Sequence, residues 1–171
     1  MNYHTITKED MVNGPGLRAV LWVSGCEHHC QNCHNPETWC RTSGEPFDEA
    51  AEALIFEELA KEHISGITIS GGDPLAPYNR EQVTEICKKI RKQYNLLRGT
   101  AKKPCKTIWV YTGYLYEEVK DLEIMKYINV LVDGEFKQAL YSPNLDWKGS
   151  ANQRVINIPK TREAHEVILE Y

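Results

Sequence analysis

Short apolar runs rich in β-branched residues recur along the chain. Within each run the apolar residues are nearly continuous, whereas a strand with one face in water would alternate apolar and polar positions. Continuous runs are typical of strands that are covered on both faces, as in a parallel sheet. The predicted strands are Ala19–Ser24, Ile67–Ser70, Thr107–Tyr111, Asn129–Asp133 and Arg154–Ile158.

Helical patterns occupy the segments between the first four runs. Asp48 stands where it can cap the first turn of one helix, and apolar residues then recur at helical spacing. Asn79 and Gln82 resemble a capping box at the start of another. The predicted helices lie within Phe47–Glu62, Asn79–Tyr94 and Leu115–Tyr127.

The alternation of strands and helices predicts an α/β fold with right-handed crossovers. The chain has 171 residues, which is enough for one domain with a core of its own, so we expect a single domain over residues 1–171. Leu96–Lys106 is predicted as a surface loop because it combines polar residues with glycine and proline.

Composition excludes several classes of protein. Hydrophobic residues make up 42% and charged residues 26%, as in ordinary globular proteins, and the net charge is −4. The sequence has no basic stripe of the kind that would indicate binding to nucleic acid or to an anionic membrane. No apolar run is long enough to span a bilayer, and the first ten residues lack the apolar core of a signal peptide. We therefore expect a cytoplasmic protein.

Glycines and polar residues follow each of the first four predicted strands. Parallel sheets and barrels carry their active sites at the carboxyl ends of the strands, so these segments are expected to meet at one site. The segments are Gly25–Cys26, Gly71–Pro74, Thr112–Tyr114 and Asp133–Gly134.

Three of the six cysteines fall within eight residues, in the stretch SGCEHHCQNCHNPETW from Ser24 to Trp39. Cys26, Cys30 and Cys33 stand in a polar loop, which disfavours three buried core thiols. A disulfide framework is not expected in a cytoplasmic chain of this length. Metal ligation is therefore the favoured interpretation.

Two kinds of metal site fit the triplet. Structural zinc needs a fourth ligand, which a nearby histidine or cysteine would supply. A 4Fe–4S cluster held by three thiolates leaves one iron open, and an open metal position indicates catalysis or substrate binding. Cys87 is predicted in a helix core, whereas Cys105 lies in the predicted loop. The candidate fourth zinc ligands are His28, His29, His34 and Cys40.

The C-x3-C-x2-C pattern after a first strand resembles the signature of radical S-adenosylmethionine enzymes, and GGDP resembles their glycine-rich turn. Within that superfamily, five blocks in order resemble the proteins that activate anaerobic ribonucleoside-triphosphate reductases. The resemblance runs from about Asp10 to about Ile158. The blocks are Asn13–Cys26, Cys33–Trp39, Ile69–Leu75, Tyr111–Tyr114 and Val130–Phe136.

The resemblance implies roles for particular residues. Cys26, Cys30 and Cys33 would hold one 4Fe–4S cluster, whose open iron would chelate S-adenosylmethionine. Thr112 and Asp133 would contact the cofactor or a cation, although Asp133 with Gly134 also fits a plain tight turn. The residues implied to bind the cofactor are Asn35, Gly71, Gly72, Asp73, Thr112 and Asp133.

The resemblance also implies a reaction and a fold. The protein would cleave S-adenosylmethionine reductively, with a donor such as reduced flavodoxin, and generate a glycyl radical on anaerobic ribonucleoside-triphosphate reductase. Because a (β/α) barrel typically has about 250 residues, an open, truncated barrel with about four or five parallel strands is expected. The alternatives are an activator of another glycyl-radical enzyme, such as a formate-lyase, and a non-enzymatic iron–sulfur or zinc binding module.

Overall fold

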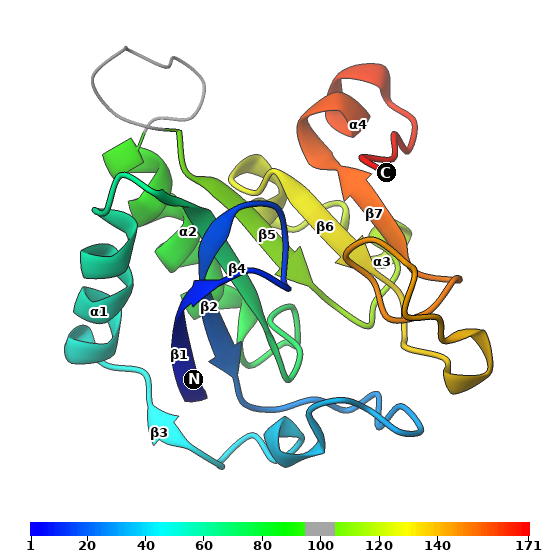
Figure 1. The fold of residues 1–171 in the computed structure, drawn as a ribbon, viewed down its shortest axis with the longest axis horizontal. Coiled ribbons are helices and arrows are strands. Elements are labelled where there is room, and N and C mark those ends of the chain that lie inside the picture. Colours follow the sequence, from blue (N-terminus) through cyan, green and yellow to red (C-terminus); the bar gives the residue numbers. More distant parts are fainter. Residues whose placement is uncertain (95–104) are drawn as a thin grey trace.

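A computed structural model describes residues 1–94 and 105–171. The chain forms a seven-stranded sheet in the order β3-β1-β2-β4-β5-β6-β7 (Figure 1). Most of the loop predicted at Leu96–Lys106 lies outside the described residues. The strands are β1 Asn2–Asp10, β2 Leu17–Val23, β3 Glu45–Pro46, β4 Ile64–Gly71, β5 Thr107–Tyr111, β6 Val130–Asp133 and β7 Arg154–Asn157.

The centre of the sheet is parallel and its flanks are antiparallel. β2, β4, β5 and β6 pair in parallel, which confirms the α/β class. β7 runs antiparallel to β6, and β1 and β3 add an antiparallel flank beside β2. We predicted about four or five parallel strands, and the sheet has four. The strand order alone does not test whether the sheet curves into a truncated barrel, so the barrel stays a prediction.

The helices differ in detail from those predicted. Asp48 caps the first helix as expected, with its carboxylate accepting the Ala51 N–H at 2.9 Å. The segment predicted as a third helix is broken into one helical turn and a 3₁₀ turn, η2, over Glu123–Lys126. The helices are α1 Glu49–Leu59, α2 Arg80–Tyr94, α3 Tyr116–Val119 and α4 Ile158–Ala164.

The capping box predicted at the start of α2 is wrong. The Asn79 amide instead donates to the carbonyls of Ser24 and Asp73, both at 2.9 Å. The Gln82 amide donates to the Phe47 carbonyl at 3.1 Å. Both side chains therefore tie α2 to the loops around it, because buried loop carbonyls there need donors.

The two faces of the sheet are covered differently. α1, α2 and η2 pack their apolar residues against one face and form the main core with β2, β4 and β5. The other face carries a smaller apolar cluster around Trp109 together with buried Arg18, whose guanidinium donates to Thr68 and Thr107 at 2.9 Å and lies over the Trp109 ring. The central strands are therefore covered on both faces, which confirms the interpretation of the continuous apolar runs.

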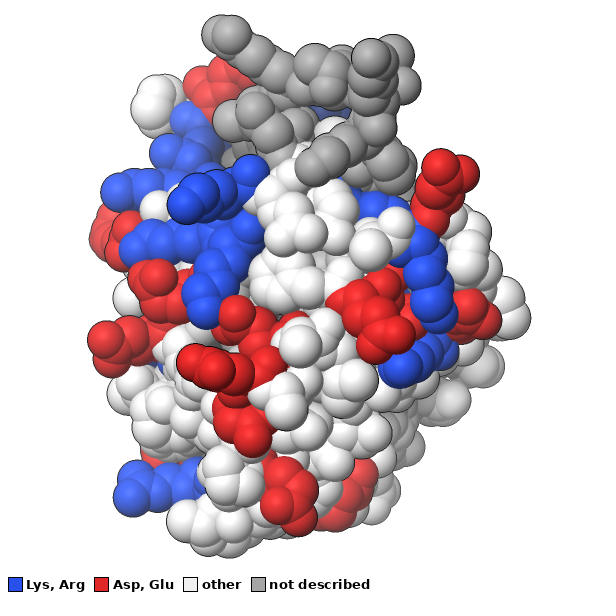
Figure 2. Space-filling model, turned by 90° about the vertical axis from the view of Figure 1, so that its left-hand side faces the viewer, with Lys and Arg blue, Asp and Glu red and all other residues white. Residues whose placement is uncertain are grey.

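Charges of both signs are mixed on the side of the molecule that carries α1. Figure 2 shows Lys and Arg side chains lying beside Asp and Glu side chains there. Lys89, for example, pairs with Glu52 at 2.7 Å. Within residues 1–94 and 105–171, no helix has the length and apolar character needed to cross a bilayer.

Candidate metal and cofactor site

The ends of the four parallel strands meet at one cavity of about 390 Å³, a volume that suits a small ligand. Each of the four segments that follow these strands contributes to its lining, as the strand-end argument predicted. Asp133 is the one predicted site residue outside the lining. The predicted residues that line the cavity are Cys26, Cys30, Cys33, Asn35, Gly71, Gly72, Asp73 and Thr112.

The cysteine loop leaves β2 and is fixed at its start by backbone hydrogen bonds. Gly25 turns the chain with a φ of +95°, which favours glycine. The Cys26 N–H donates to the Trp39 carbonyl at 3.0 Å. Farther along, the Asn35 N–H donates to the Cys33 Sγ at 3.4 Å. The loop therefore presents partly buried thiols to the cavity.

The other cysteines lie elsewhere. Cys40 is exposed, and its thiol contacts the Thr42 hydroxyl at 3.3 Å. Cys87 is fully buried in the core on α2, as predicted, and burial raises the pKa of its thiol to about 12. Cys105 is exposed at the edge of the described residues.

Burial also shapes the chemistry of the cavity thiols. It raises the pKa of Cys26 to about 11 and also raises the pKa of Cys30. Both thiols are therefore protonated at neutral pH in the metal-free protein, and a metal must displace these protons to bind. The Phe136 N–H opposes this effect at Cys30 by bonding to its sulfur.

The chemistry of the cavity thiols suits an iron–sulfur cluster. In the described part of the chain, no three His, Cys, Asp or Glu side chains converge as ligands of a single ion. The three thiols nevertheless line one cavity, and thiolates are the usual ligands of iron–sulfur clusters. His28, a candidate zinc ligand, has both ring nitrogens bonded to carboxylates.

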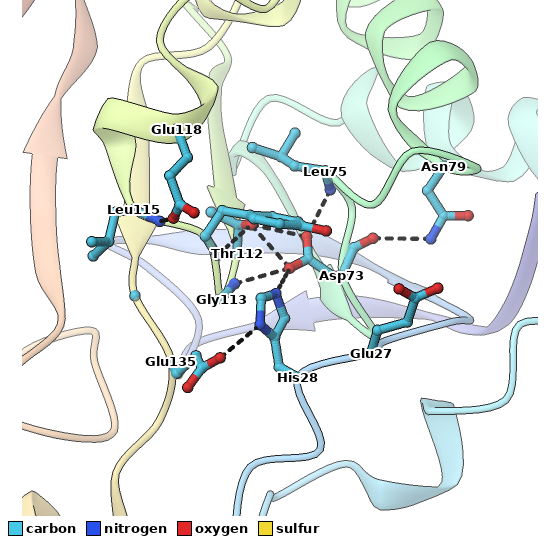
Figure 3. A network of polar contacts seen from close by, with 12 residues as sticks. Glu27, His28, Asp73, Leu75, Asn79, Thr112, Gly113, Leu115, Glu118 and Glu135 are labelled. Atoms are coloured by element: carbon cyan, nitrogen blue, oxygen red, sulfur yellow. Dashed lines mark hydrogen bonds and ion pairs between the residues drawn. The ribbon is translucent and has the colours of Figure 1, made fainter.

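Asp73 is the centre of the polar network at the strand ends (Figure 3). Its carboxylate is buried and accepts hydrogen bonds from the Leu75 N–H at 2.8 Å, the Thr112 hydroxyl at 2.9 Å and the Gly113 N–H at 3.0 Å. His28 Nε2 lies 2.8 Å from the same carboxylate. Asp73 thus joins the ends of β2, β4 and β5, and its contact with the cofactor stays a prediction.

His28 has a role that sequence reasoning missed. Its ring bridges Asp73 and the carboxylate of Glu135, which lies 3.0 Å from Nδ1 (Figure 3). The ring also packs edge-on against Tyr114. The hydrogen bond to Asp73 is the main cause that raises the pKa of His28 to about 9. The sequence offered one signal, a histidine placed midway between two cysteines.

Gly71 ends β4 and Gly72 follows it, and the close approach of neighbouring backbone requires glycine at both positions. A Cβ on Gly72 would lie 2.5 Å from the Gly25 carbonyl oxygen, and one on Gly71 would lie 2.8 Å from the Val23 carbonyl oxygen. Gly71 also has a φ of +102°. The structure thus shows a close approach to β2 and to the Gly25 turn that follows it, and the predicted approach to a ligand stays a prediction.

Asp133 is buried at the end of β6 and is bonded on the protein side. It accepts from the Tyr116 N–H at 2.7 Å and from Arg154 Nε at 3.0 Å. Arg154 also pairs with Glu117 at 2.8 Å. Both carboxylate oxygens of Asp133 thus bond to protein donors, and its cofactor role stays a prediction.

Several cavity residues gave no local signal in the sequence. Some of them lie at or near the ends of the strands themselves, and the others lie on the connections before β2 and after β6. Gln153, for example, accepts from the Gly149 N–H at 2.9 Å and donates to the Gly134 carbonyl at 2.9 Å, which shapes one wall. The residues missed are Asp10, Val12, Trp22, Ser70, Tyr111, Phe136, Gly149 and Gln153.

Comparison with known proteins places the chain among iron–sulfur proteins. A family model described as "4Fe-4S single cluster domain" matches residues 12–156. An anaerobic ribonucleoside-triphosphate reductase-activating protein of Escherichia coli K12 is 45% identical over 159 residues, covering 91% of this chain and 97% of that protein. Its namesake in Enterobacteria phage T4 is 40% identical over 155 residues (91% and 93%), and the one in Vibrio cholerae is 40% identical over 157 residues (90% and 96%).

Proposed function

Because the chain belongs to the family of anaerobic ribonucleoside-triphosphate reductase-activating proteins, we propose that it generates a glycyl radical on such a reductase by cleaving S-adenosylmethionine at one 4Fe–4S cluster. The observation that carries this proposal is the gathering of Cys26, Cys30 and Cys33 around one cavity at the carboxyl ends of parallel strands. Three thiol donors leave one iron for the cofactor, which indicates a reactive rather than a structural centre.

Cys26, Cys30 and Cys33 would hold the cluster, which would supply one electron, drawn from a donor such as reduced flavodoxin, for the reductive cleavage of S-adenosylmethionine. The outcome of that chemistry would be removal of a hydrogen atom from a glycine Cα of the reductase. The chain's own contribution is to hold the three thiols at one cavity. The Asn35 N–H donates to the Cys33 sulfur, and the Phe136 N–H favours the thiolate of Cys30.

The five predicted cofactor residues that line the cavity divide into two groups under this proposal. Asn35, Gly71 and Gly72 line the cavity and can offer backbone groups to the cofactor. The carboxylate of Asp73 and the hydroxyl of Thr112 bond to one another at 2.9 Å, so we assign them to ordering the strand ends.

The proposed partner is a large protein, and the rim of the cavity supports this. Met11 is 71% exposed and Val12 is 75% exposed, and Val12 itself lines the cavity. Leu140 and Tyr141 are 43% and 47% exposed on the connection between β6 and β7. Exposed apolar side chains of this size mark protein contact sites. In this proposal the sheet acts as an open, truncated (β/α) barrel that admits a loop of the reductase.

The decisive experiment is radical transfer between the two proteins. The anaerobically reconstituted protein is mixed with its reductase, S-adenosylmethionine and reduced flavodoxin, and a glycyl doublet is expected on the reductase by electron paramagnetic resonance. A reductase with its radical glycine changed to alanine should give no doublet. A colourless zinc protein, radical formation on a formate-lyase alone, or turnover of a free small molecule without any protein radical would overturn the proposal.

A further inference from the structure

The loop from Cys26 to Cys30 carries an unusual side-chain anchor at its midpoint. His28 Nε2 lies 2.8 Å from Asp73, which follows β4, and Nδ1 lies 3.0 Å from Glu135, which follows β6. The neighbouring His29 bonds within the loop, with Nδ1 2.9 Å from the Glu27 carbonyl. His28 therefore connects the thiol-bearing loop to two other strand ends.

A specific space accommodates the His28 ring. A Cβ on Gly113 would lie 2.4 Å from His28 Cδ2 and 2.6 Å from Nε2. Gly113 also donates its N–H to the Asp73 carboxylate at 3.0 Å, and Tyr114 packs edge-on against the ring at 4.8 Å between centroids. The absence of a side chain at Gly113 is what permits the ring to reach Asp73.

We propose that His28 is a positioning residue, seated against Gly113 and bonded to Asp73 and Glu135, that holds the Cys26–Cys30 loop in the shape needed to retain its cluster. This inference rests on the proposed function in one respect, namely that the thiols bind iron. Side chains that orient metal ligands typically account for a tenfold to hundredfold change in metal affinity. The contacts are within the protein, so their loss acts on the loop before any cofactor binds.

The first test compares neighbouring histidines. His28→Ala and His28→Gln are reconstituted with iron and sulfide, and His29→Asn serves as the matched control because Asn tolerates the positive φ of 48° at that position. We expect His28→Ala to lose iron to a chelator about ten to a hundred times faster than the unaltered protein. His28→Gln keeps one donor for Asp73, so its rate of iron loss should lie between those of His28→Ala and the unaltered protein. His29→Asn should lose iron at the rate of the unaltered protein.

The second test uses Gly113 to separate positioning from general instability. Gly113→Ala should accelerate iron loss as His28→Ala does, because the added methyl displaces the ring. In the His28→Ala background the same change should have almost no further effect, because the ring that it displaces is gone. This non-additivity is the signature of a shared contact.

Thermal unfolding of the metal-free variants identifies any general loss of fold. If the unaltered protein fails to hold a 4Fe–4S cluster, the proposed function fails. If it holds the cluster and His28→Ala releases iron at the same rate, the positioning role is overturned. Additive effects of His28→Ala and Gly113→Ala would also overturn it, since the two residues would then act independently.

Discussion

At the scale of single residues, the role of a cysteine depends on its surroundings. Cys26, Cys30 and Cys33 face a cavity, whereas Cys87 is enclosed by the core. We expect alanine at any of the three cavity positions to abolish cleavage of S-adenosylmethionine and to lower bound iron. Cys87→Ala should keep both and cost about 1 kcal/mol of stability. Iron analysis and a cleavage assay test this, and full activity with normal iron in Cys30→Ala would contradict the assignment.

Gly72 offers a second test at this scale. In Gly72→Ala the new methyl meets the backbone of Gly25, which cannot move without shifting Cys26. We expect a loss of about 3 kcal/mol in the free energy of unfolding, at the upper end for overpacking, together with reduced iron binding. Gly134→Ala, whose Cβ would have its nearest contact at 3.7 Å, should cost less, about 1 to 2 kcal/mol, because only its φ of +91° disfavours a side chain. Urea unfolding of both metal-free variants measures the difference, and equal costs would contradict the argument.

The residues that sequence reasoning found share a short-range signal. The cysteine triplet and GGDP are recognisable from spacing alone, and both line the cavity. The position of His28 was not predictable, because its partners Asp73 and Glu135 lie 45 and 107 positions away in the sequence. Pairings of that range depend on strand order, which a local pattern does not encode.

At the scale of elements, apolar periodicity identified the strands that are covered on both faces. β1 escaped because its residues are mostly half-buried and its sequence, NYHTITKED, is polar. The direction of β7 also escaped, since its apolar run is compatible with either pairing. Antiparallel strands at the edges of a parallel sheet are common, so composition alone does not tell whether an edge strand is parallel or antiparallel.

The junction of β6 and β7 carries a prediction of its own. Asp133 is buried and bonds to Arg154 across this antiparallel pair. Asp133→Asn should lower the free energy of unfolding by about 3 kcal/mol, because it leaves the guanidinium without its buried partner. Binding of S-adenosylmethionine by the folded, loaded protein should be unchanged. Normal stability with weakened cofactor binding would instead support the cofactor role predicted from the sequence.

At the scale of the whole molecule, exposed apolar residues lie on the connections before β2 and after β6, and both connections also contribute residues to the cavity lining. One holds Met11 and the other Leu140, and neither residue lines the cavity. The segment before β2 is held firmly, since Asp10 accepts the N–H groups of Val12 and Asn13 at 2.9 and 2.8 Å. Exposed apolar residues beside the proposed cluster site suit contact with a second protein.

This arrangement separates chemistry from partner contact. Met11→Glu and Leu140→Glu should leave cleavage of S-adenosylmethionine with a chemical reductant unchanged, because neither side chain faces the cavity. Both should reduce the glycyl radical formed on the reductase by about tenfold, since each buries a charge at the contact. Leu54→Glu on α1, which is 40% exposed on the helix-covered side, is the matched control and should activate the reductase normally. Equal activation by all three variants would place the contact elsewhere, whereas a parallel loss of cleavage would show that the rim shapes the cavity itself.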